Sequence, residues 1–139
     1  MAGELFFNQV AQPKAVRNIL EQAYHDPDAV TDELVDLILK PGLEPGALHV
    51  FLAFISYSGG PLPGELLTQV TQPISILWGR EDPWEKIEAG RQFAHLPSVE
   101  EFIEIPEGGH CVMCEKSEVV NPLIKRFIER HSNDELLLT

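Results

Sequence analysis

Two short apolar segments, at residues 74–78 and 102–105, constrain the fold of this chain more than any other feature. Both contain β-branched residues and are bounded by proline or glycine, which is the pattern of a buried strand. The segment between them is long enough for a helix, and strands joined by a helical crossover lie parallel with a right-handed connection. With the helical pattern that follows, residues 74–131 are predicted to form a βαβα unit with two parallel strands.

Prolines indicate where the helices of this second half begin. Asp82 and Asn121 each precede a proline, which is the pattern of an N-cap followed by a proline in the first turn. We therefore expect one helix to open at Asp82 and a last helix to open at Asn121 and continue to about His131. The remaining residues, 132–139, are predicted to be a frayed tail.

The first half has the pattern of helices separated by proline and glycine. Helices are expected to open near Pro13, at Asp26 as an N-cap, and near Pro45. The stretch at 50–55 is apolar on nearly all sides, so its helix is expected to be deeply buried. A loop at 58–64 then ends a helical segment of residues 1–64, and an α/β segment of residues 65–131 follows.

The charge of the chain limits its partners. It has 139 residues, with 22 acidic and 10 basic side chains and a formal net charge of −12. Such a surface repels phosphate, so neither nucleic acid nor an anionic membrane is expected as a partner. No apolar run approaches the ~20 residues of a membrane span, and the N-terminus lacks a secretory signal. Two cysteines give no disulfide framework, so a soluble protein of a reduced intracellular compartment is expected.

Asp82 and His110 are the candidate catalytic residues. Each follows one of the predicted strands, and parallel strands end at the same edge of a sheet, where open α/β sheets place their ligands. A carboxylate at that edge can hold one imidazole nitrogen while the other nitrogen accepts a proton from a nucleophile. The pair is therefore predicted to supply the acid and the base of a hydrolytic triad, with no cofactor and no metal.

Other interpretations of the same residues stay open. Asp82 has the position of an ordinary helix cap, and His110 has that of a solvent-facing turn histidine. Cys111 and Cys114 have the C-x-x-C spacing of thiol oxidoreductases, although two buried small apolar residues are a simpler interpretation. A zinc site would need a fourth ligand that the sequence does not identify.

Three phrases of the second half resemble the C-terminal half of an α/β-hydrolase: ILWGREDPW (76–84), IPEGGH (105–110) and VVNPLI (119–124). In that family an acid follows the penultimate strand and a histidine follows the last strand. The resemblance therefore implies that Asp82 is the triad acid and His110 the triad base. It also implies that the chain has an incomplete α/β-hydrolase fold.

Two phrases of the first half, at 40–47 and 54–63, are similar to a plant and cyanobacterial branch of this family. That branch includes the pheophytinases and chlorophyll dephytylases, which cleave phytyl esters. The resemblance implies a helical lid at 1–64, a small hydrophobic phytyl-like ester as substrate of the full-length form, and a chloroplast location.

The match departs from the family at the nucleophile. An α/β-hydrolase places its serine in a G-x-S-x-G turn between a strand and a helix, and this sequence has no such turn. Ser58 comes closest, but it follows a predicted helix and precedes Pro61 and Pro63, so we reject it as a nucleophile. Each missing oxyanion donor costs ~3–4 kcal/mol, so the chain is expected to be inactive alone. The alternative function is a non-catalytic truncated product that binds a partner or self-associates through an exposed strand edge.

Overall fold

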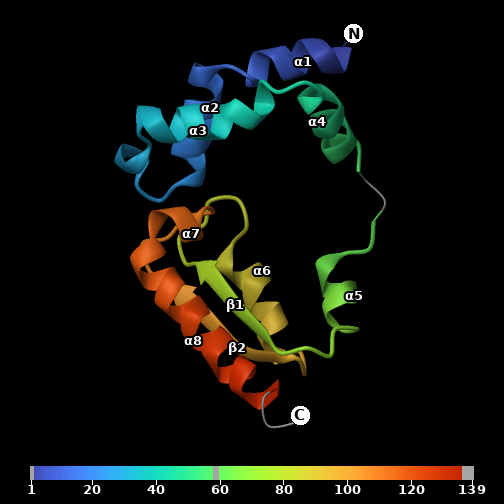
Figure 1. Ribbon diagram of the computed structural model, residues 1–139, viewed down its shortest axis with the longest axis vertical. Coiled ribbons are helices and arrows are strands. Elements are labelled where there is room, and N and C mark those ends of the chain that lie inside the picture. Colours follow the sequence, from blue (N-terminus) through green and yellow to red (C-terminus); the bar gives the residue numbers. More distant parts are fainter. Residues whose placement is uncertain (1, 58–59, 136–139) are drawn as a thin grey trace.

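The computed structural model describes residues 2–57 and 60–135 and consists of a group of N-terminal helices and a small α/β unit (Figure 1). The predicted α/β class, with helices first and strands in the second half, is confirmed. In chain order the elements are α1 (Ala2–Val10), α2 (Pro13–Ala23), a 3-10 turn (Pro27–Ala29), α3 (Asp32–Gly42), α4 (Ala47–Ser56), α5 (Pro63–Leu67), β1 (Ile74–Gly79), α6 (Ile87–Arg91), a 3-10 turn (Gln92–His95), β2 (Val99–Ile105), α7 (Val112–Glu115) and α8 (Ser117–Glu135).

The two strands form a parallel pair, as predicted. The register runs from Ile74 opposite Val99 to Gly79 opposite Ile105, with one irregularity directly after Ile74. Within residues 2–57 and 60–135 these strands form a two-stranded sheet. Because the strands are parallel, β1 and β2 end at the same edge of the sheet, beside the N-terminal helices (Figure 1).

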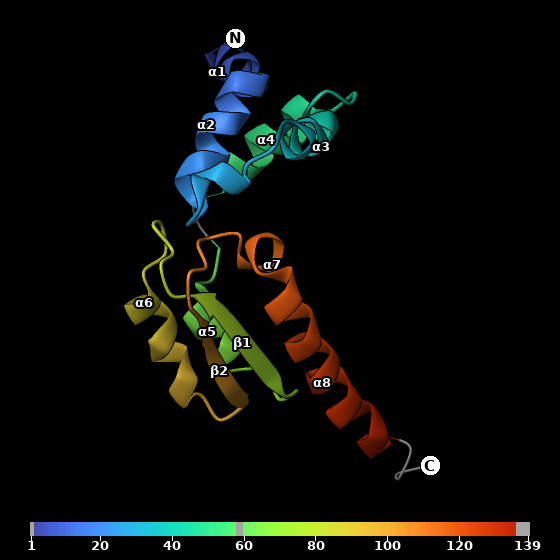
Figure 2. The same cartoon turned by 90° about the vertical axis from the view of Figure 1, so that its left-hand side faces the viewer.

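Helices cover both faces of this sheet, with α6 on one side and α8 on the other (Figure 2). On the α8 side, Ile105 and Val120 are almost completely buried and pack with Val112. On the other side, α6 approaches closely because it has a glycine. A Cβ atom at Gly90 would lie 2.6 Å from the ring of Trp78. Burial on both faces is normal for parallel strands and explains their apolar sequences.

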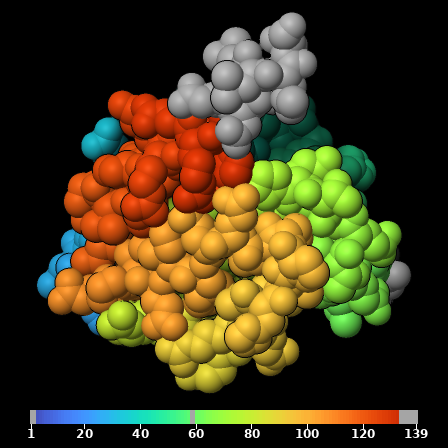
Figure 3. Space-filling model, turned by 90° about the horizontal axis from the view of Figure 1, so that it is seen from below, coloured from blue at the N-terminus to red at the C-terminus, as the bar shows by residue number. Residues whose placement is uncertain are grey.

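Two glutamates of β2 join the sheet to its neighbours. Glu101 accepts a hydrogen bond from Ser75 at 2.7 Å and pairs with Arg126 of α8 at 3.4 Å. Glu104 pairs with Arg91 of α6 at 2.7 Å. Figure 3 shows this end of the molecule, where α8 lies on one side of the β2 segment and α5 on the other.

These contacts predict a loss of stability in acid. A hydrogen bond from Ser75 lowers the pKa of Glu101, and one from Arg91 lowers the pKa of Glu104. Each carboxylate therefore stabilises the fold above the unfolded pKa of about 4.3, and this stability is lost as the pH falls through the lowered folded pKa. We expect the free energy of unfolding to decrease below about pH 5 and to decrease less steeply in a Glu101→Gln/Glu104→Gln variant.

Urea unfolding at a series of pH values measures this slope, which reports the protons taken up on unfolding. The control is Glu118→Gln, which removes an exposed carboxylate of α8. An acid slope as steep in the double variant as in the wild type would contradict the prediction.

The N-terminal helices have a small core of their own. Helices α2 and α3 bury one cluster between them: Leu20, Ala23, Tyr24, Val30 and Val35. Cys111, from the loop after β2, packs against this cluster. The helical part and the α/β unit are therefore in contact next to the ends of the two strands.

The predicted deep burial of residues 50–55 is wrong. In α4, Val50 is 72% exposed and Phe54 is 80% exposed. Only one side of α4 is covered by α1, where Phe51 packs against Phe7 with ring centroids 5.3 Å apart. A helix that is apolar all round is buried only when neighbours surround it, and α4 has few.

No single helix among the described residues is long and apolar enough to span a membrane, although α3 and α4 together pass that test across a 90° bend.

Two predicted helix starts in the second half are also wrong. After Asp82 the chain forms turns, and α6 begins only at Ile87. Helix α8 begins at Ser117, contains Pro122 and continues to Glu135, beyond the predicted end of the helix. Its first amides find acceptors in the preceding turn, for example Val120 N–H to the carbonyl of Lys116 at 2.8 Å. Pro122 has no N–H group, so the carbonyl of Glu118, an exposed residue of the first turn, has no donor within the helix.

Smaller differences occur in the first half. The N-cap of α3 is Thr31, whose Oγ1 accepts a hydrogen bond from Leu34 N–H at 3.1 Å. Asp26 instead caps the 3-10 turn before α3. Helix α1 was not predicted, and α5 begins inside the predicted loop. Ser58, within that loop, and residues 136–139 of the predicted tail lie outside the described residues.

Candidate active site

The loops that follow the two strands are in direct backbone contact. Arg80 N–H donates to the carbonyl of Ile105 at 3.0 Å, and Glu81 N–H donates to that of Gly108 at 3.0 Å. Gly79, the last residue of β1, allows this approach, because a Cβ atom there would lie 2.1 Å from the carbonyl oxygen of Gly109. The backbone contacts thus place the chain after β1 against the glycine pair before His110.

Asp82 and His110 are brought together at this edge of the sheet. Nδ1 of His110 lies 2.9 Å from Oδ2 of Asp82, whose side chain is only 6% exposed. The other oxygen, Oδ1, accepts hydrogen bonds from the backbone N–H groups of Trp84 and Glu85, both at 2.9 Å. The predicted juxtaposition is therefore confirmed. The carboxylate caps a turn with one oxygen and holds the imidazole with the other, but it is not a helix cap, because α6 begins only at Ile87.

The geometry leaves one nitrogen of His110 available. When Nδ1–H donates to the carboxylate, the neutral ring has its acceptor lone pair on Nε2. Among residues 2–57 and 60–135, none hydrogen-bonds Nε2. The imidazole is 38% exposed and contacts the ring of Trp84, with centroids 4.9 Å apart and planes at 53°. An oriented imidazole with a free nitrogen can accept and return a proton.

A small hollow of about 190 Å³ contains the pair. It is lined by Leu77, Trp78, Gly79, Asp82, Glu85, His110, Val112 and Met113, which include no serine. Ser56, at the end of α4, donates its hydroxyl to the carbonyl of Ala53 at 3.1 Å. The described part of the chain therefore offers no hydroxyl nucleophile beside His110.

The cysteines do not have the properties of an activated thiol pair. Both are free, and Cys111 lies at the N-cap of the short helix α7. Burial raises the pKa of the Cys111 thiol, and the nearby Cys114, Glu115 and Asp82 raise it further. A raised pKa means less thiolate, which is the reactive form. Within the described residues, no group of three or more His, Cys, Asp or Glu side chains could hold a metal ion.

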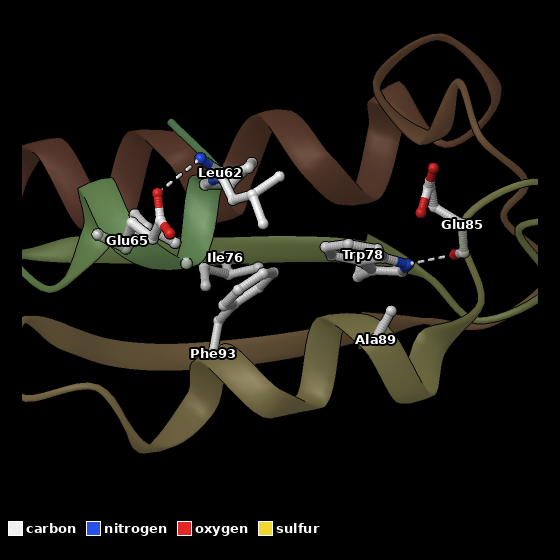
Figure 4. A pocket seen from close by; sticks show the side chains of 10 residues that line it. Leu62, Glu65, Ile76, Trp78, Glu85, Ala89 and Phe93 are labelled. Atoms are coloured by element: carbon white, nitrogen blue, oxygen red, sulfur yellow. Dashed lines mark hydrogen bonds between the residues drawn. The ribbon is translucent and has the colours of Figure 1, made fainter. Parts of the chain in front are cut away.

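A larger apolar pocket of about 860 Å³ adjoins this hollow, between α5, β1 and α6 (Figure 4). Phe93, Ile76 and Leu62 are among the apolar residues that line it. Trp78, whose Nε1–H donates to the carbonyl of Glu85 at 2.9 Å, borders both spaces. The pocket contains neither Asp82 nor His110 and lies along β1 on the side of α6. The apolar space and the hollow of the acid–base pair are therefore neighbours that share Trp78 and Glu85 in their linings.

Two contacts in and beside His110 were not predicted. The ring of Trp84 lies against the imidazole. Glu115 was not predicted to be part of the site, although its carboxylate accepts a hydrogen bond from the backbone N–H of Gly109 at 3.1 Å, directly before His110. The one feature of the local sequence that could indicate this contact is the glutamate five residues after the histidine, at the end of a short helical turn.

The chain is similar in sequence to known hydrolases. No family model matches it. It is 29% identical over 130 residues to the chloroplastic pheophytinase of Arabidopsis thaliana, covering 91% of this chain and 27% of the relative. It is 25% identical over 126 residues to the uncharacterized hydrolase YugF of Bacillus subtilis, covering 90% of this chain and 46% of the relative. The chain thus spans less than half the length of these curated relatives.

A solved structure gives the same result for the fold. A meta-cleavage product hydrolase from Pseudomonas fluorescens matches with a TM-score of 0.67 at 22% identity, over 86% of this chain and 46% of that chain. The chain has the fold of the C-terminal part of an α/β-hydrolase, which confirms the resemblance predicted from its sequence. It matches both pheophytinase and YugF over nine-tenths or more of its own length.

Proposed function

We propose that this chain supplies the acid–base half of an ester hydrolase of the α/β-hydrolase type, with Asp82 orienting the base and His110 moving the proton. The observation that supports it most is the 2.9 Å contact between Nδ1 of His110 and Oδ2 of the buried Asp82. The free Nε2 on the same ring is the second support.

In the proposed reaction, the hydroxyl of a serine from outside this chain attacks the ester carbonyl, and Nε2 of His110 accepts its proton. Asp82 stabilises the imidazolium through Nδ1–H. Nε2–H then protonates the leaving alkoxide oxygen, which gives an alcohol and an acyl-serine. A water molecule repeats the sequence, and the serine leaves with the proton that His110 returns.

The proposed substrate is an ester with a large apolar alcohol, such as a phytyl-like group, and the proposed location is the chloroplast. The similarity to a chloroplastic pheophytinase supports both. The exposed apolar side chains of α4, such as Phe54 and Val50, also suit a lid over an apolar group.

A chimera tests the proposal. This chain replaces the matching part of the Bacillus subtilis hydrolase, and the matched control has His110→Ala in the same chimera. We expect the chimera to hydrolyse a p-nitrophenyl ester and to react with a fluorophosphonate probe. The His110→Ala form should turn over at least about 1,000-fold more slowly, because the serine loses its base. The chain by itself should neither hydrolyse the ester nor react with the probe.

A second candidate is a non-catalytic product that binds a partner. It is favoured by the edge of β1 that pairs with no strand among the described residues, since such an edge can recruit another strand. Equal turnover by the chimera and its His110→Ala form would favour this candidate. Stoichiometric probe labelling of the isolated chain would contradict both candidates.

A further inference from the structure

Two hydrogen bonds join the end of α2 to the segment that bears His110, and a third lies within that segment. His110 N–H donates to the carbonyl of Ala23 at 2.8 Å. His25 N–H donates to Oε2 of Glu115 at 2.7 Å, and Gly109 N–H donates to Oε1 of the same carboxylate at 3.1 Å. One carboxylate therefore bridges the helical part and the backbone next to the histidine.

Helix geometry explains why these groups need partners. The last carbonyls of a helix have no donor within that helix. At the end of α2, Tyr24 N–H bonds the carbonyl of Leu20, whereas the carbonyl of Ala23 relies on His110. Ala23 is only 1% exposed and Gly109 is buried, so water has little access to these two groups, whereas His25 is exposed. Breaking this contact therefore leaves polar groups unsatisfied, which is costly.

The contact has no room for a side chain at its centre. A Cβ atom at Gly109 would lie 2.5 Å from the carbonyl oxygen of Ala23 and 2.8 Å from Oε1 of Glu115. Glu115 is held in place by its own backbone, whose N–H donates to the carbonyl of Cys111 at 3.0 Å. In the described residues, no basic side chain forms an ion pair with Glu115. Its charge is directed at the two backbone amides, and hydrogen bonds to a carboxylate are stronger than neutral ones.

We propose that Glu115 is a positioning residue that aligns His110 on Asp82 and couples this alignment to the position of the helical part. Movement of α2 away from the sheet edge must release the hydrogen bonds at Ala23 and His25, whereas the bond between Gly109 and Glu115 stays within the α/β unit. The backbone N–H of His110 then loses its anchor, and the contact between Nδ1 and Oδ2 loosens. The catalytic meaning of this coupling rests on the proposed function, whereas the coupling itself does not.

Substitution of Glu115 in the full chain tests the coupling. Glu115→Ala removes both acceptors, and Glu115→Gln keeps the size but leaves one acceptor and places an NH2 group against the other amide. We expect amide hydrogen exchange at His25 and Gly109 to accelerate about tenfold or more in Glu115→Ala, and less in Glu115→Gln. The nitrogen resonances of the His110 imidazole should shift in the same order. Glu118→Gln, three residues further on and exposed, is the control and should change neither.

Two outcomes would overturn the proposal. The first is a Glu115→Ala protein that unfolds at a lower urea concentration but keeps the imidazole resonances of the wild type. That result would mean that Glu115 stabilises the fold without aligning His110. The other comes from the wild type alone and applies even if the variants fail to fold: exchange of the His25 and His110 amides, which both bond across to the other part, with unrelated opening rates. These measurements test the alignment of His110 and not its catalytic role. The proposal about Glu115 can therefore fail while the chimera remains active, and an inactive chimera would contradict the proposed function without contradicting the coupling.

Discussion

Replacing Gly79 with alanine is expected to destabilise the fold by about 3 kcal/mol or more, at the upper end of overpacking substitutions. The added Cβ atom would lie 2.1 Å from the carbonyl oxygen of Gly109 and 2.5 Å from that of Gly108. These neighbours are backbone atoms in a buried loop, so they cannot move aside as a flexible side chain could. The loop must shift, which separates the histidine from its carboxylate.

Urea unfolding measures this loss, and Gly42→Ala is the matched control. A Cβ atom at Gly42 meets nothing within 4 Å, and the residue lies in the last turn of α3. The control should be as stable as the wild type or slightly more stable, because alanine has the higher helix propensity. A Gly79→Ala protein within about 0.5 kcal/mol of the wild type would show that the two loops tolerate separation.

The second large effect is expected for Asp82→Asn. The amide oxygen can still accept from Trp84 and Glu85 N–H, but its NH2 group now faces Nδ1 of His110. The imidazole must then accept at Nδ1 and carry its proton on Nε2, so it can no longer take a proton from a nucleophile. In the active chimera we expect kcat to fall about 10,000-fold, the loss known for this change in a serine-protease triad.

The tautomer change can be measured on the chain itself, because the imidazole nitrogen resonances distinguish the two forms. Glu81→Gln is the control, since it removes a neighbouring exposed carboxylate and leaves Asp82 in place. An Asp82→Asn protein that keeps the proton on Nδ1 would contradict the proposed role of the carboxylate.

The strands and the acid–base pair could be predicted because they depend on local pattern and on topology. Residues 74–78 and 102–105 are apolar and β-branched, and a single helical connection between them requires parallel pairing. Parallel pairing then brings the residues after both strands to one edge. Asp82 and His110 follow from these steps without any knowledge of side-chain packing.

Other features could not be predicted because they depend on distant neighbours. The apolar sequence of α4 does not reveal that few helices surround it. The start of α8 depends on acceptors supplied by the preceding turn, which override the signal of Asn121 and its proline. Glu115 has a partner 90 residues earlier in the chain, and no local spacing identifies such a contact.

The acid and the base lie 28 residues apart on one strand–helix–strand unit. Together with Gly79 and Glu115 they occupy one uninterrupted stretch of the polypeptide. Recombination at its borders would transfer the pair and the glycine contact together, but not Ala23 and His25, which bond this stretch from outside. An engineer who transplants the stretch into another parallel sheet must therefore also supply a carbonyl for His110 N–H and an amide for Glu115.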